Sequence, residues 1–254
     1  NMSVRSYVSI ISLKYVGIVF KMNFGGIIMK IMILEDNIEI NRILTELFHE
    51  EGYEVSSFYN AFDALKSFKN EKFSCVLTDL MLPIMNGEEF IKKIRTDYYG
   101  LIIAITAKVN ESDKLHVLEL GADDYITKPF NKKEVLLKVN NYFKKINKSN
   151  HKTSLNQGEF VYDFHDNTLT INRNSITLTS MEYLTLGVFV KSINKIITRE
   201  TILQTVYYDD VDIFDRVIDG HIKNLRKKIK EFTDTEYIVT VYGMGYKLVG
   251  EADE

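Results

Sequence analysis

The stretch from 74 to 83, SCVLTDLMLP, contains an apolar run that ends on an acid, Asp79. Three other apolar runs also end on polar residues: 31–34 before Glu35 and Asp36, 101–105 before Thr106, and 125–127 before Lys128. Short apolar runs separated by helical patterns predict buried strands of a parallel sheet. Residues that follow such strands meet at the carboxyl edge of the sheet, where open α/β sheets bind ligands. We therefore expect these polar residues in one pocket.

The chemistry of this predicted pocket is specific. Three carboxylates repel one another unless a cation joins them, and Mg²⁺ prefers oxygen ligands, keeps several waters and is found beside phosphates. Lys128 adds a monovalent positive charge, and Thr106 adds a hydroxyl donor. The set predicts a site that transfers a phosphoryl group onto a carboxylate.

Four motifs resemble the receiver domain of bacterial response regulators and occur in the same order: MILEDN (32–37), LTDLMLPIMNG (77–87), ITA (105–107) and GADDYITKPF (121–130). The resemblance implies that Asp79 accepts the phosphoryl group and that Lys128 pairs with it. The implied switch residues are Thr106 and Tyr125, and the Lys128-Pro129 peptide bond is implied to be cis. The implied Mg²⁺ ligands are Glu35, Asp36, Asp79 and the backbone carbonyl of Met81.

Residues 29–145 contain five strand–helix units, which predict a five-stranded, doubly wound parallel sheet of the flavodoxin-like receiver type. The expected strands lie near 30–34, 53–57, 74–78, 101–105 and 123–126. The expected helices lie near 38–51, 60–69, 86–96, 110–120 and 131–145. This domain accounts for about half of the 254 residues, so a second domain is expected.

Composition narrows the class of protein. The single cysteine, Cys75, lies in the middle of a predicted strand, which excludes a disulfide scaffold and a cysteine-based metal site. The net charge of −3 says little about the function by itself.

Residues 1–28 do not fit the receiver pattern, and we expect them to be a non-native or misassigned extension before a start at Met29. Their apolar run, 7–20, is too short to span a bilayer and contains a lysine, so we expect no membrane association and a cytoplasmic location.

The polar stretch 146–157 predicts a linker, and 158–250 predicts a smaller α+β domain. Short alternating strands come first, followed by a helix that begins after Thr179 or Ser180 and a second helix over 199–206. A third helix over 214–232 has an apolar stripe and a basic face, and the segment 237–249 predicts a hairpin. The six cations of the basic face are Arg216, Lys223, Arg226, Lys227, Lys228 and Lys230.

This second half resembles the winged-helix effector domain of OmpR/PhoB-type regulators in the motifs LTSMEYLTL (178–186), ITRETIL (197–203), DRVIDGHIKNLRKKI (215–229) and TVYGMGYKL (240–248). A basic helix face alone is usually a solvated surface; the order of the flanking elements favours double-stranded DNA as the ligand. The resemblance implies a recognition helix in the major groove and a wing at the minor groove. The predicted DNA contacts are Arg216, His221, Lys223, Asn224, Arg226, Lys227 and Tyr242.

The chain departs from the family pattern at several positions. Tyr242 stands where the wing usually offers an arginine, and Gly220 occupies the middle of the recognition helix, where it lowers helix propensity. The receiver's family dimer contacts become Lys114 with Glu134 and Asp124 with Lys138, and lysine lacks the bidentate fork of arginine.

The predicted function is that of a non-enzymatic two-component response regulator. A sensor histidine kinase phosphorylates Asp79, receivers form a homodimer, and the winged helices bind DNA to regulate transcription, with RNA polymerase as a further partner. One alternative is an orphan regulator that binds DNA without phosphorylation. An aspartyl-phosphatase is disfavoured because Met81 stands where a second carboxylate is required.

Overall fold

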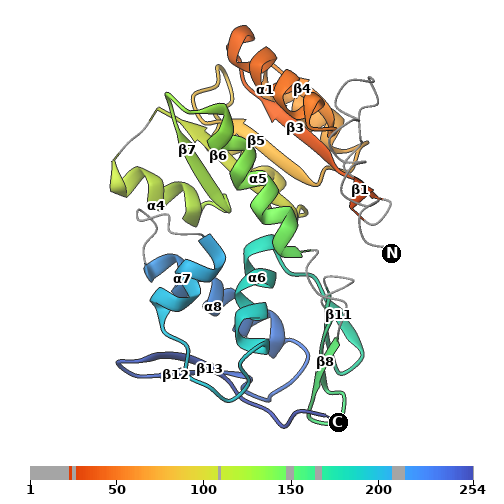
Figure 1. Ribbon diagram of the computed structural model, residues 1–254, viewed down its shortest axis with the longest axis vertical. Helices are drawn as coiled ribbons and strands as arrows, with labels where there is room; N and C mark the ends of the chain where they lie inside the picture. The colour runs from red at the N-terminus through yellow and green to blue at the C-terminus, as the bar shows by residue number, and fades with distance from the viewer. Residues whose placement is uncertain are drawn as a thin grey trace, which may run out of the picture.

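The computed structural model describes residues 23–24, 27–107, 110–146, 152–163, 168–207 and 215–253. Its larger sheet has five parallel strands in the order β4-β3-β5-β6-β7 (Figure 1). The strands are β3 (Lys30–Leu34), β4 (Glu54–Phe58), β5 (Cys75–Asp79), β6 (Leu101–Thr106) and β7 (Asp124–Thr127). The predicted doubly wound receiver sheet is confirmed, and each observed strand lies within about one residue of its expected position.

Five helices alternate with these strands: α1 (Ile38–Glu50), α2 (Ala61–Phe68), α3 (Gly87–Ile94), α4 (Glu111–Glu119) and α5 (Lys132–Ile146). Helix α1 contacts α5, whereas α2 contacts α3, as expected when helices cover both faces of a parallel sheet. Strands β5 and β6 are buried along their whole length because both faces are covered. Asn37, Asn60 and Asn86 cap α1, α2 and α3 through side-chain oxygens that accept backbone N–H groups.

The second part of the chain is an α+β unit. An antiparallel sheet has the order β11-β10-β9-β8 and is made by β8 (Lys152–Leu155), β9 (Phe160–Asp163), β10 (Thr168–Ile171) and β11 (Asn174–Ile176). Three helices follow, namely α6 (Ser180–Val190), α7 (Arg199–Tyr207) and α8 (Asp215–Lys230). A closing hairpin pairs β12 (Ile238–Val241) with β13 (Gly245–Leu248). This order of elements is that of a winged helix.

Local details fix the ends of these elements. Thr179 caps α6 in a capping box with Glu182, so of the two predicted caps it is the one used. The isolated bridge between Ile197 and Tyr246 joins the loop before α7 to the hairpin. At Gly245, with φ of +145°, an added Cβ would lie 2.2 Å from the carbonyl oxygen of Ile197, so this close approach requires glycine.

One segment differs from the sequence-based expectation, and a second contains a strand pairing that the sequence did not predict. Strand β8 lies inside the stretch 146–157 that we predicted as a linker, and its Leu155 is fully buried. The polar composition of β8 does not indicate a strand, because this strand is stabilised by its pairing with β9. Within the predicted extension 1–28, residues 23–24 (β1) and 27–28 (β2) pair as a short antiparallel ladder; the rest of that extension lies outside the described residues.

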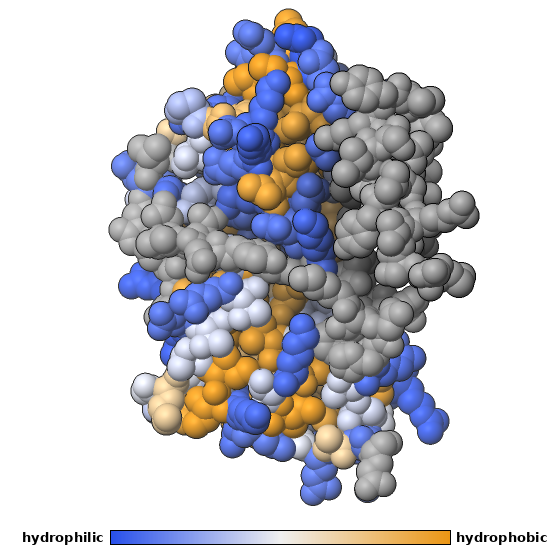
Figure 2. All heavy atoms as spheres, viewed as in Figure 1, coloured by the Kyte–Doolittle hydropathy of each residue, from blue (hydrophilic) through white to orange (hydrophobic). Residues whose placement is uncertain are grey.

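The surface of the molecule carries exposed hydrophobic side chains and a groove. Figure 2, drawn from the same side as Figure 1, shows hydrophobic side chains on both halves of this face, over the receiver above and over the winged helix below. A groove of about 640 Å³ between α6 and α7 is lined by Leu184, Val188, Ile196 and Val206, among others. Among the described helices, none is both long and apolar enough to cross a bilayer.

Candidate functional site

The predicted acidic residues meet at the carboxyl edge of the larger sheet. Glu35 and Asp36 follow β3, and Asp79 ends β5, the adjacent strand. One carboxylate oxygen from each of these residues lies within 4.8 Å of the others. Glu35 and Asp79 are buried, whereas Asp36 is exposed, so the cluster opens to solvent on one side.

Lys128 connects the two buried acids. Its Nζ lies 2.8 Å from Glu35 Oε2 and 2.7 Å from Asp79 Oδ2, and its backbone N–H donates to the carbonyl oxygen of Thr106. Burial raises the pKa of Glu35 above its ordinary value, and the Lys128 hydrogen bond only partly opposes this. For Lys128 itself, burial lowers the pKa, but the hydrogen bonds with Asp79 and Glu35 outweigh it, so the net pKa is raised and the amine stays charged.

The backbone packs closely around Asp79. The Met81 N–H donates to Asp79 Oδ1 at 2.9 Å, which orients the carboxylate, while the Met81 side chain is exposed. Gly87, the first residue of α3, donates its N–H to the Leu80 carbonyl oxygen at 3.0 Å. A Cβ at Gly87 would lie 2.0 Å from the carbonyl oxygen of Asp79, so α3 approaches the strand end directly at the pocket.

Thr106 and Tyr125, the predicted switch residues, lie on the neighbouring strands β6 and β7 and are both buried. The ammonium group of Lys114 in α4 lies 5.0 Å from the centre of the Tyr125 ring, in cation–π geometry. The Lys128-Pro129 peptide bond is cis, as the resemblance implied.

Asn41 is a residue of this site that the sequence reasoning missed. Its side chain is 1% exposed, and its Nδ2 donates to the carbonyl oxygens of Glu35 and Phe58, both at 3.0 Å. The amide thereby ties the loop that carries Glu35 and Asp36 to the end of β4. A signal existed in the sequence, because Asn41 is a polar residue on the inner stripe of α1, three and seven residues before the buried Leu44 and Phe48.

The Asn41→Asp substitution tests this positioning role. The new carboxylate keeps the shape of the side chain but cannot donate to either carbonyl, and it adds negative charge beside the acidic cluster. We expect a loss of about 1–3 kcal/mol in the free energy of unfolding. Mg²⁺ binding should weaken because release of the loop that carries Glu35 and Asp36 outweighs the attraction of the added charge for the cation. Urea denaturation and isothermal titration with Mg²⁺ measure the two effects. Asn70→Asp, which removes an exposed side-chain bond to Lys66, is the matched control; equal midpoints for both variants would contradict the role.

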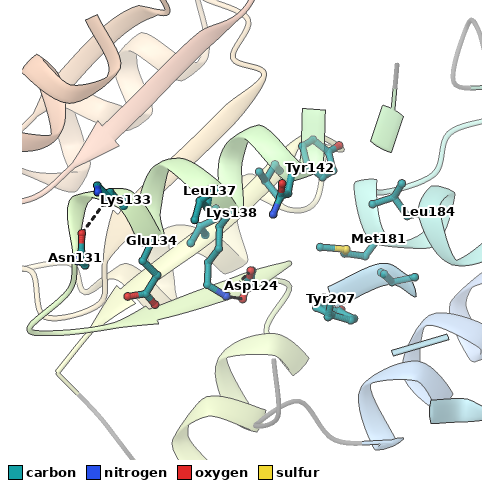
Figure 3. A pocket seen from close by; sticks show the side chains of 14 residues that line it. Asp124, Asn131, Lys133, Glu134, Leu137, Lys138, Tyr142, Met181, Leu184 and Tyr207 are labelled. Atoms are coloured by element: carbon teal, nitrogen blue, oxygen red, sulfur yellow. Dashed lines mark hydrogen bonds and ion pairs between the residues drawn. The ribbon is translucent and has the colours of Figure 1, made fainter. Parts of the chain in front are cut away.

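The predicted dimer residues lie on the face made by α4, β7 and α5. Lys138 Nζ lies 2.9 Å from Asp124 Oδ2 within the same chain. Asp124, Glu134 and Lys138 line a cavity of about 370 Å³ (Figure 3), and Lys114 lies over Tyr125. This structure therefore places three of the four predicted dimer residues around one cavity.

The predicted recognition helix, α8, buries its apolar stripe against α6 and α7. Its predicted DNA contacts Arg216, Lys223, Asn224 and Lys227 are exposed, and Tyr242 in the turn between β12 and β13 is 92% exposed. Two anchors hold this turn against the helices: Tyr246 in β13 donates its hydroxyl hydrogen to Asp219 Oδ1, and Arg199 lies over the Tyr246 ring.

Two of the predicted DNA contacts are engaged elsewhere in this conformer. His221 is half-buried, its Nε2 lies 2.8 Å from the hydroxyl of Tyr207, and burial lowers its pKa to about 4, so the imidazole is neutral at pH 7. Arg226 donates from Nε to the Ile238 carbonyl and from its second terminal nitrogen to Thr240 Oγ1. The cationic pattern did not reveal these bonds because their partners, Tyr207, Ile238 and Thr240, come from other elements.

An acid pocket on a parallel sheet, joined to a winged helix, defines a two-domain regulator of transcription. Residues 31–140 match the response regulator receiver domain family, and residues 173–248 match the family described as transcriptional regulatory protein, C terminal. The chain belongs to the OmpR/PhoB-type two-component response regulators, which regulate transcription in response to phosphorylation.

Individual relatives agree with this assignment. The chain is 32% identical over 225 residues to the transcriptional regulatory protein CpxR homolog of Haemophilus influenzae, covering 87% of this chain and 99% of that protein. It is 33% identical over 217 residues to the response regulator ArlR of Staphylococcus aureus, with 85% and 98% covered. A solved structure of a RitR mutant covers 87% of this chain and 98% of its own at a TM-score of 0.64; at 22% identity it shows the shared fold.

Proposed function

We propose that Asp79 is the residue that accepts the phosphoryl group and that a sensor histidine kinase is its physiological donor. The observation that carries this proposal is the pocket in which Lys128 joins the buried carboxylates of Glu35 and Asp79 while the exposed Asp36 leaves one side open. A nucleophile held beside a fixed cation, with an open side for the donor, suits in-line transfer.

In the proposed step, an oxygen of the Asp79 carboxylate attacks phosphorus and forms the new P–O bond as the P–N bond of phosphohistidine breaks. The electron pair of that bond leaves with the imidazole. The Met81 N–H holds the other carboxylate oxygen, Oδ1, and Lys128 faces the developing negative charge. The product adds about 0.5–1 negative charge to the pocket, since a phosphoryl group carries about 1.5–2 charges where the carboxylate carried one.

The donor set fits Mg²⁺ because it consists of hard oxygen ligands on one open edge. In this proposal Glu35, Asp36, Asp79 and the Met81 carbonyl hold the ion. When bound, it neutralises charge on the phosphoryl oxygens. Lys128 loses its contact with Asp79 Oδ2 in part when that oxygen becomes esterified, and it then pairs with the phosphoryl group instead.

The output in this proposal is DNA binding by a homodimer. Thr106 and Tyr125 respond to the phosphoryl group, and the face made by α4, β7 and α5 pairs two receivers through Lys114, Asp124, Glu134 and Lys138. Helix α8 then enters the major groove and the turn at Tyr242 lies near the minor groove. RNA polymerase is the further partner, and the cytoplasm is the proposed location, because both the kinase donor and DNA are reached there.

The test uses the full chain with acetyl phosphate as the donor, with Mg²⁺ or with EDTA. With acetyl phosphate and Mg²⁺ we expect one phosphoryl adduct by intact mass and a shift from monomer to dimer by light scattering. With acetyl phosphate and EDTA we expect neither. The phosphorylated dimer should bind a mixed-sequence 30-base-pair duplex more tightly, and its affinity should fall with salt at a slope of about −0.9 for each phosphate neutralised.

Three outcomes separate the candidates. An adduct with dimerisation and tighter DNA binding supports the proposal. DNA binding that is already maximal before phosphorylation supports the orphan regulator instead. No adduct from acetyl phosphate or from a panel of purified histidine kinases contradicts the assignment of Asp79.

A further inference from the structure

Strand β8 is an outer strand of the four-stranded sheet, and residues 251–253, which we call the tail, lie along its outer side (Figure 1). The Asp253 N–H donates to the Ser154 carbonyl oxygen at 3.0 Å, and the Asn156 N–H donates to the Glu251 carbonyl oxygen at 2.9 Å. Backbone hydrogen bonds of this kind are those by which an extended peptide adds to the edge of a sheet.

The turn that follows β8 holds a carboxylate. Asn156, Gln157 and Gly158 have φ of +53°, +58° and +83°, and consecutive residues in a turn of this kind can direct their backbone N–H groups at one anion. The N–H of Gln157 donates to Asp253 Oδ1 at 2.7 Å, and the N–H of Gly158 donates to Asp253 Oδ2 at 2.8 Å. The Ser154 hydroxyl donates to Oδ2 as well. We call these three donors the carboxylate nest.

The nest favours the ionised form of its occupant. The hydrogen bond from Ser154 is the largest of the effects that lower the pKa of Asp253 below its ordinary value, and the two backbone bonds act in the same direction. A neutral side chain of the same size would offer the nest a single acceptor oxygen and no charge. One backbone donor would then lose its protein partner.

The approach to the nest accepts only small residues. The side chain of Asn194 holds Gly250, because its Nδ2 donates to the Gly250 carbonyl at 2.8 Å and its Oδ1 accepts the Gly250 N–H at 3.3 Å. A Cβ at Gly250 would lie 3.0 Å from Cδ1 of the buried Leu155, which is tighter than an ordinary contact. Ala252 is the residue bridged to Leu155. The site therefore suits a segment with small residues one and three positions before the acid.

The tail resembles a bound peptide more than a part of the core. Glu251 and Ala252 are exposed and Asp253 is half-buried, so hydrogen bonds hold the tail, with little apolar burial. Segments held in this way open at a lower free energy than core strands. The tail can therefore leave while the four-stranded sheet stays folded.

We propose that the outer side of β8 and the carboxylate nest form a docking site for an extended acidic segment, and that the tail is its built-in occupant. The bound tail covers N–H and C=O groups of β8 that would otherwise be open to pairing with another chain. The residues that bind the tail lie outside the phosphorylation pocket and outside α8, so this site is independent of the proposed function.

The first test measures hydrogen exchange in the full chain by NMR. In the Asp253→Asn variant, the amides of Gln157 and Gly158 should exchange roughly fivefold faster, as expected for the loss of one hydrogen bond of ordinary net strength. Glu251→Gln is the matched control, because it removes the same charge two residues away while Glu251 contacts Asn156 through its backbone. Equal exchange rates in the two variants would show that the nest does not recognise a carboxylate.

The second test asks whether the site takes a separate ligand. The probe is the acetylated peptide GEADE, which has the sequence of residues 250–254, added to the full-length Asp253→Asn variant. We expect the peptide to shift the amide resonances of Gln157 and Gly158 and to restore their slow exchange. The same peptide carrying Asp253→Asn should bind roughly fivefold more weakly.

Two results would overturn the docking site. One is the absence of any shift at Gln157 and Gly158 up to the solubility limit of the peptide. The other is a dimer of the Asp253→Asn variant, seen by light scattering without a phosphodonor, that the peptide does not dissociate. A second copy of the chain, and not an acidic segment, would then be the partner of β8.

Discussion

Asp79→Asn is expected to remove the phosphoryl adduct completely while leaving the fold intact. Asparagine has the same shape and keeps an oxygen that accepts the Met81 N–H, but its amide is not a nucleophile toward phosphorus. The Lys128 ammonium retains Glu35 as its partner at 2.8 Å, so the pocket is not left with an unpaired buried cation. Intact mass after treatment with acetyl phosphate and Mg²⁺ measures the adduct, and circular dichroism confirms the fold.

Asp97→Asn is the control for this result, because Asp97 is an exposed acid outside the pocket. It should take up one phosphoryl group at the wild-type rate. An adduct of equal yield on the Asp79→Asn variant would place the acceptor elsewhere and remove the central element of the proposed function.

Two glycine substitutions are expected to change stability in opposite directions. At Gly87 an alanine Cβ would lie 2.0 Å from the Asp79 carbonyl oxygen, a backbone atom that cannot move aside cheaply. We expect Gly87→Ala to cost about 3 kcal/mol, at the upper end for overpacking, and to slow phosphorylation because Asp79 must shift. At Gly220 nothing lies within 4 Å of the new Cβ, and helix propensity alone should stabilise α8 by about 0.5–1 kcal/mol.

Urea denaturation of both variants, with the wild type alongside, measures this difference. The chemical change is the same in each, so the contrast isolates the close approach of α3 to the phosphorylation pocket. Equal midpoints for the two variants would mean that the backbone near Gly87 relaxes, and that the pocket is less rigid than its geometry indicates.

Much of the receiver was predictable from short-range pattern. The pocket was predicted from the polar residues at strand ends, Glu35, Asp79 and Lys128. Residues at the carboxyl ends of parallel strands converge whatever the intervening loops contain. Asn41 was missed because its role depends on the carbonyl of Phe58, seventeen residues away. No helix or strand periodicity relates these two positions. Strand β8 was missed because a polar strand is recognisable only through the partner that pairs with it.

The sequence by itself determined the two folds, the acidic pocket with its lysine, and a basic helix beside a hairpin, because each depends on side-chain order within one element or at one sheet edge. Only the tertiary structure decided which basic residues are available. It engages Arg226 with β12 and Lys228 with Glu182, and it turns His221 toward Tyr207 and the receiver. Hydrophobic periodicity specifies which face of a helix is buried, but not whether a neighbouring domain covers the polar face, since that depends on contacts such as Tyr99 with Ser180 between residues far apart in the chain.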